Sequence, residues 1–145
     1  MSSDLARYLF LAGAVPYLLL GTLHAYHTPQ RPTDRRGLSP ADPDLSQAMT
    51  RTRMLLTPHT DLWLAWVGFN LSHSLGVVLF GLAVLLIGRS SSSFDSQAAV
   101  FLPFAVAVSG AYVALAVRYW FRIPLAGCLL SFACFVAAWA LRAAG

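Results

Sequence analysis

Apolar residues along this chain gather into four long runs separated by shorter polar stretches. The runs extend from about residue 6 to 26, 62 to 87, 98 to 119 and 124 to 141. Each approaches the roughly 20 residues that an α-helix needs to cross about 30 Å of hydrocarbon. The runs are continuous rather than alternating, which favours helices over barrel strands. The pattern therefore predicts an all-α bundle of four transmembrane helices, forming a single integral membrane domain over residues 1–145.

The composition agrees with this pattern. Hydrophobic residues make up 57% of the chain and charged residues only 11%, whereas a soluble domain carries roughly 25% charge. Every basic residue is Arg and every acidic residue is Asp, which together with abundant Ala and Leu is typical of a GC-rich bacterial genome. We therefore expect a bacterial inner-membrane protein rather than a soluble enzyme. Its basic charge lies in loops between apolar runs, so we expect no nucleic-acid partner.

The distribution of arginines predicts the orientation. With four crossings both termini share one side, and cytoplasmic loops are the ones enriched in Arg. Loops 27–61 and 120–123 with their flanks carry seven arginines, against three on the other side: Arg31, Arg35, Arg36, Arg51, Arg53, Arg118 and Arg122, against Arg7, Arg89 and Arg142. The bias predicts cytoplasmic loops 27–61 and 120–123, with both termini outside.

The loops differ in character. The long first loop opens with a Pro- and Arg-rich stretch that excludes a regular helix, and residues 45–56 then favour a short helix on the cytoplasmic surface. An irregular lid is the alternative. The Ser-rich segment 88–96 predicts a flexible connection. A turn around Arg122–Pro124 predicts a tight hairpin between the last two helices.

The second run carries the most informative pattern. His59, Trp63, Trp66, Asn70 and His73 are spaced by four, three, four and three residues, which places them on one helical face. His73 lies about 17 Å along the helix from Leu62 at a rise of 1.5 Å per residue, so we expect it near the bilayer centre. An ionisable residue at that depth indicates a functional site. The alternative is that Asn and His only hydrogen-bond to neighbouring helices.

Other runs supply partners for this face. His24 and His27 end the first run, and we expect His24 to lie roughly two turns nearer the cytoplasm than His73, at the height of His59. Tyr112 and Arg118 approach the same side from the third run. Together these side chains would line a tapering pocket with imidazoles at its cytoplasmic opening. Aromatic and arginine side chains also form ordinary interfacial belts, which is the alternative for Arg118 and Trp63.

This arrangement favours a protein that binds a lipophilic small molecule in a pocket open to the cytoplasm. His73 and Asn70 are the catalytic candidates if it also transforms that molecule, as an isomerase or a reductase does. Whether it is an enzyme stays open. The expected ligand-binding residues are His24, His59, Trp63, Trp66, Phe69, Tyr112 and Arg118.

Two other functions stay open. Pairs of histidines could ligate haem b, as in other helical bundles, and His24, His27 and His59 could hold a metal. Alternatively, small residues such as Ala105 and Ser109 could pack against a second copy or a larger membrane partner, which would make the chain a structural or regulatory subunit.

Two segments also carry a resemblance. Gly68-Phe-Asn-Leu-Ser-His-Ser-Leu-Gly76 and Leu23-His-Ala-Tyr-His27 resemble segments of small four-helix bacterial membrane proteins. The resemblance covers about the first half of the chain. It implies the four-helix fold and no particular activity.

Overall fold

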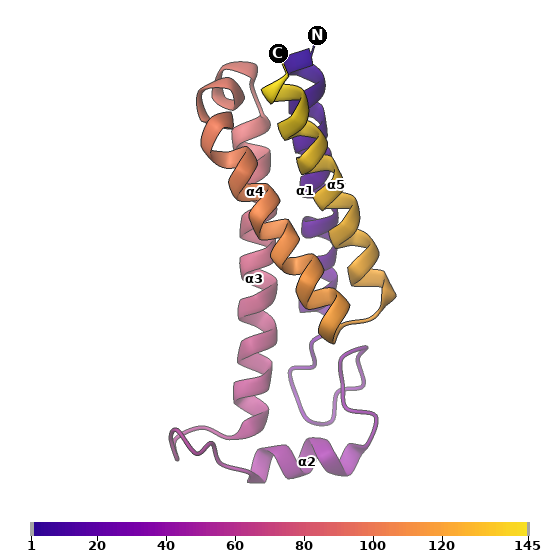
Figure 1. The fold of residues 1–145 in the computed structure, drawn as a ribbon. Coiled ribbons are helices and arrows are strands. Elements are labelled where there is room, and N and C mark those ends of the chain that lie inside the picture. Colours follow the sequence, from indigo (N-terminus) through magenta and orange to yellow (C-terminus); the bar gives the residue numbers. More distant parts are fainter. Residues whose placement is uncertain (1, 145) are drawn as a thin grey trace. The chain divides into compact units, whose positions relative to one another are not determined.

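The computed structural model describes residues 2–144, which form five helices (Figure 1). These are α1 (Ser2–His27), α2 (Pro43–Arg51), α3 (Leu62–Gly88), α4 (Ser91–Tyr119) and α5 (Arg122–Ala143). Four of them, α1, α3, α4 and α5, are long and apolar enough to cross a membrane. The predicted all-helical fold and its four long apolar helices are thus confirmed, and they are compatible with an integral membrane protein.

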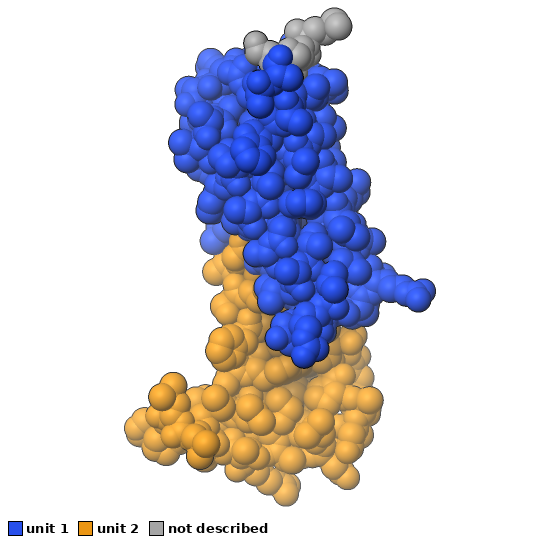
Figure 2. All heavy atoms as spheres, viewed as in Figure 1, with its two compact units in different colours: residues 1–20, 77–145 blue, residues 21–76 orange. Residues whose placement is uncertain are grey.

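The chain divides into two compact units (Figure 2). Unit 1 consists of Met1–Leu20 and Val77–Gly145, and unit 2 of Gly21–Gly76. The division falls within α1 and α3, so each of these helices contributes to both units.

Unit 1 is built around a cluster of aromatic rings. The rings of Phe10 and Phe94 are 5.4 Å apart between centroids, and those of Phe10 and Phe135 are 5.7 Å apart. Tyr17 meets Phe80 edge-on at 5.0 Å. Tilted and edge-on contacts at these distances suit the ring quadrupoles. The aromatic cluster therefore joins α1, α3, α4 and α5 within unit 1.

Small residues let the helices of unit 1 approach closely. An ideal Cβ on Gly13 would lie 2.8 Å from Cδ1 of the buried Phe135 ring. One on Gly81 would lie 3.4 Å from the carbonyl oxygen of Ala14. Ala105 and Ser109, considered above as a surface for a partner, are instead buried inside the chain. These two positions therefore contribute to internal packing.

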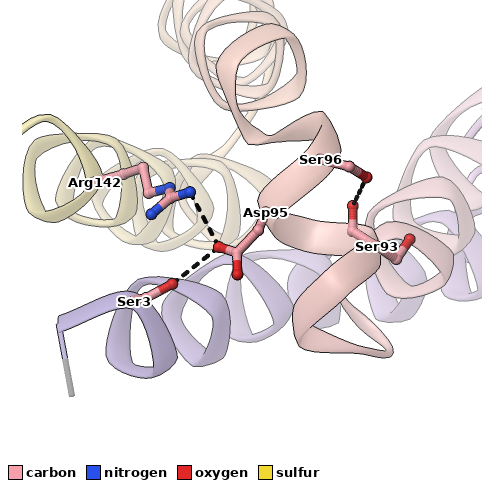
Figure 3. Close-up of polar contacts among 5 residues, drawn as sticks. All are labelled: Ser3, Ser93, Asp95, Ser96 and Arg142. Atoms are coloured by element: carbon pink, nitrogen blue, oxygen red, sulfur yellow. Dashed lines mark hydrogen bonds and ion pairs between the residues drawn. The ribbon is translucent and has the colours of Figure 1, made fainter.

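One end of unit 1 is joined by polar contacts (Figure 3). Asp95 of α4 accepts a hydrogen bond from Ser3 of α1 at 3.0 Å, and it pairs with Arg142 of α5 at 3.1 Å. The pair is partly exposed, so it contributes little to stability but aligns three helices. The helix α4 also begins at Ser91, earlier than the expected residue 98, because Ser90 accepts a hydrogen bond from the Ser93 backbone. The predicted flexible stretch 88–96 is therefore mostly helical.

The connection between α4 and α5 is as short as the sequence suggests. Only Trp120 and Phe121 separate the two helices. Pro124 lies in the first turn of α5, where its missing N–H leaves no helical hydrogen bond unmade. The predicted tight hairpin is therefore present.

Unit 2 begins with the end of α1, which the following loop closes. Thr28 donates to the carbonyl oxygens of His24 and Ala25, Arg36 donates to that of Tyr26, and Leu38 donates to that of His27. The last four carbonyls of a helix have no partner inside it, and here each is satisfied. The loop thereby fixes the end of α1 at His27.

A short helix was expected over residues 45–56, and α2 forms there but is shorter than that range. Asp42 caps its start by accepting a hydrogen bond from the Asp44 backbone, with Pro43 in the first position. It ends at Arg51 rather than near Leu56. Past Thr52 the backbone pairs with the residues before α3, through an Arg53–Asp61 bridge, so a helix cannot continue. That α2 lies on the cytoplasmic surface stays a prediction.

We expect Gly13→Ala to lower the free energy of unfolding by about 1–3 kcal/mol, because the new methyl group overlaps the buried Phe135 ring. Gly68→Ala is the matched control. An ideal Cβ on Gly68 meets no atom within 4 Å, so this variant should be neutral or slightly more stable. Equilibrium unfolding in mixed micelles measures both, and equal effects would contradict the packing described here.

Asp34 provides a pH-dependent test of the loop. Its carboxylate accepts hydrogen bonds from the Arg31 and Gln30 backbones, and these hold its pKa below the usual range. A lowered pKa means that the carboxylate stabilises the loop above about pH 4, and that this contribution disappears as the pH falls through the lowered pKa. NMR titration should show the carboxyl and both amide resonances sharing one midpoint below that of a free Asp. A midpoint at or above the usual value would contradict the turn.

Candidate functional site

The helix that carries most of the candidate site begins at Leu62. Asp61 caps it by accepting a hydrogen bond from the Leu64 backbone at 2.9 Å. His59 lies before the cap, outside the helix, and its side chain is exposed. The expected five-residue face therefore loses its first member. Trp63, Trp66, Asn70 and His73 belong to α3 as predicted.

Asn70 is held by two hydrogen bonds. Its Nδ2 donates to the carbonyl oxygen of Trp66 at 2.8 Å, one turn earlier in α3. Its Oδ1 lies 2.9 Å from Nε2 of His24 on α1. Rotating the amide by half a turn would set Oδ1 against the Trp66 carbonyl, acceptor against acceptor. The contact with the Trp66 carbonyl therefore fixes the amide orientation.

This orientation determines which atom of the His24 ring donates to Asn70. Because Oδ1 of Asn70 can only accept, Nε2 of His24 must carry the proton. A neutral imidazole then presents Nδ1 as a hydrogen-bond acceptor. His24 is thus oriented by Asn70, with Nδ1 as the acceptor of its neutral ring.

His73 completes the group. Its ring lies edge-on to that of His24, with the centroids 5.1 Å apart, and it is partly buried. The two imidazoles come from different helices and lie beside the same amide. We call His24, Asn70 and His73 the imidazole–amide cluster.

The depth predicted for this group was wrong. His24 was expected roughly two turns from His73, yet the rings are adjacent. His24 is three residues from the end of α1, about 4.5 Å, whereas His73 is eleven residues from the start of α3, about 17 Å. With the rings side by side, α3 extends about 12 Å past the end of α1. Counting from both helix ends failed because the two ends are not level.

Other residues of α3 near the cluster differ in their burial and in the face of the helix on which they lie. Ser74 donates to the Asn70 carbonyl at 2.9 Å, and the Trp63 and Trp66 rings are 5.5 Å apart. Trp63 is buried and Trp66 is partly buried. Phe69, a predicted ligand contact, is 72% exposed on another face of α3. The tryptophans thus lie on the same face as Asn70, and Phe69 does not.

The remaining predicted residues make described contacts of their own, and a role for them at this cluster stays a prediction. The His27 ring packs against Gly37 and Tyr26 in the loop that closes α1. Tyr112 and Arg118 belong to unit 1, where Tyr112 contacts Tyr17 and the Arg118 guanidinium lies over the Tyr119 ring. Within residues 2–144, no three His, Cys, Asp or Glu side chains are grouped as metal ligands. The alternative metal site of His24, His27 and His59 stays a prediction.

One residue beside the cluster, Thr28, does not stand out in the sequence pattern. Thr28 is fully buried, and its Oγ1 donates to the His24 carbonyl at 2.8 Å. The signal was the Thr28-Pro29 pair directly after His27, because a helix commonly ends before a proline. Thr28 supports the backbone of His24 rather than contacting its ring.

A double-mutant cycle tests the His24–Asn70 hydrogen bond. We expect His24→Phe and Asn70→Leu each to destabilise the protein and their combination to cost less than the sum, with a coupling of about 0.5–2 kcal/mol. Ser72→Ala serves as control, because Ser72 is exposed and bonds only to the Phe69 carbonyl of its own helix. Additive effects of the two single variants would show that the bond is absent in the bilayer.

No family model, curated protein or solved structure matches this chain. Its function is therefore inferred from the residues and their geometry.

Proposed function

We propose that this chain is an integral membrane protein that binds a lipophilic molecule bearing a hydroxyl group, such as a prenol or a sterol-like alcohol. The observation that carries the proposal is the His24–Asn70 hydrogen bond, which leaves Nδ1 of His24 as an acceptor. A hydroxyl group is the complementary donor. His73, beside His24, is the second imidazole of the cluster.

The chemistry supports binding more strongly than catalysis. Imidazoles exchange protons near neutral pH, so the cluster has the groups for proton transfer to a bound oxygen. Residues 21–27 and 62–76, however, contain no Asp or Glu, and a reductase would need an external electron donor. We therefore propose binding as the function and leave isomerase or reductase chemistry outside the proposal.

Haem ligation is the main competing function. Nε2 of His24 is engaged by Asn70, so a metal bound at that atom would have to break the hydrogen bond. The edge-on contact of the two rings at 5.1 Å places them against each other. These contacts favour a hydrogen-bonded ligand. For the orientation, we retain both termini outside and the loops 27–61 and 120–123 cytoplasmic, on the strength of the arginine bias.

The proposal predicts a preference for free hydroxyl groups. The purified protein in nanodiscs should bind geranylgeraniol roughly five- to tenfold more tightly than geranylgeranyl methyl ether, because the ether cannot donate to Nδ1 of His24. Titration calorimetry or native mass spectrometry measures both affinities. His24→Phe should abolish the preference and His73→Ala should abolish binding, whereas Ser72→Ala should leave both unchanged.

Other outcomes favour other functions. Equal affinity for the alcohol and the ether, or no binding of either, would contradict the proposal. An absorbance spectrum of the same preparation provides an independent test. A stoichiometric Soret band that sharpens on reduction would instead establish haem binding.

A further inference from the structure

Residues 52–61 between α2 and α3 form a short hairpin. The Leu62 backbone donates to the Thr52 carbonyl at 2.9 Å, and the Met54 backbone donates to the Thr60 carbonyl at 3.4 Å. An isolated bridge pairs Arg53 with Asp61. The segment therefore has a defined stem, and its second arm leads directly into α3 (Figure 1).

The tip of this hairpin presents two leucines to the surroundings. Leu55 is 108% exposed and Leu56 is 93% exposed, the two highest values among the large exposed hydrophobic residues. A water-exposed loop rarely holds two adjacent leucines outward on a hydrogen-bonded stem. The stem keeps them away from the interior of the described chain, so their apolar surface needs another environment.

The position and charge of the hairpin identify that environment. The hairpin adjoins the first turns of α3, a helix apolar enough to cross a membrane, whose Leu62 and Leu64 are also exposed. Residues 51–61 contain Arg51 and Arg53, and their single acidic residue, Asp61, accepts a hydrogen bond from the Leu64 backbone as the cap of α3. Leucines beside arginines suit the boundary between acyl chains and phosphate groups.

We propose that the 52–61 hairpin inserts Leu55 and Leu56 into the bilayer interface and that Arg51 and Arg53 bind the headgroups of anionic phospholipids. This binding surface is separate from the imidazole–amide cluster. It requires membrane integration but no bound lipophilic ligand. The hairpin then anchors the start of α3 at the membrane surface.

Spin labelling of the full chain in nanodiscs tests the proposal. A nitroxide is attached to Leu55→Cys in a chain carrying Cys128→Ala and Cys134→Ala, in bilayers of POPC or of equimolar POPC and POPG. Labels at Ala41→Cys and Leu75→Cys give water-exposed and lipid-facing references, since both positions are exposed in the loop and in α3 respectively. The collision rates with oxygen and with a water-soluble nickel chelate report the depth.

The label at position 55 should favour oxygen over the chelate, and more strongly in bilayers that contain POPG. Arg51→Gln and Arg53→Gln should each lower the ratio of inserted to water-exposed label by roughly fivefold. Arg31→Gln, a charge removed elsewhere in the loop, should leave it unchanged. Helix content by circular dichroism verifies that the variants fold.

Three results would overturn the proposal. Chelate access equal to that at Ala41 would show that the tip is in water. If insertion changes neither with POPG nor with either arginine variant, Arg51 and Arg53 do not bind the headgroups. Spin–spin broadening that disappears on dilution with unlabelled protein would show that a second copy covers the leucines.

Discussion

A chain that enters hydrocarbon must satisfy its backbone hydrogen bonds within the protein, and the rest of this structure follows from that constraint. Inside the four long helices the requirement is met residue by residue. At helix ends it needs other partners. The end of α1 shows how they are supplied: Thr28, Arg36 and Leu38 together satisfy its last four carbonyls. The loop thus acts as a cap whose hydrogen bonds determine where α1 stops.

The location of that cap has consequences for the candidate site. Because α1 stops at His27, His24 lies one turn from a helix end, and α3 continues well past it. Asn70 and His73 meet His24 from the longer helix. The result is a polar group close to an end of α1.

The sequence predicted the residues of this cluster more successfully than their relative levels. The spacing of Trp63, Trp66, Asn70 and His73 identified one face of α3, and that face carries the contacts to His24. His59 was assigned to the same face only because periodicity does not reveal where a helix begins. Asp61, a good N-cap two residues later, marks the true start. Phe69 was predicted to pack on the hydrocarbon of the ligand, yet a step of one residue moves it away from Asn70 around the helix.

By itself, the sequence determined the helical class, the number of long apolar helices and the tight turn between the last two. These properties depend on hydropathy, length and local turn chemistry, which are encoded within short segments. The tertiary structure decided the pairing of His24 with Asn70, the burial of Ser109 within the chain and the hairpin that ends α2 early. Each of these depends on how far one segment extends relative to another. That offset is set by packing and by helix caps between residues distant in the chain, and no local pattern records it.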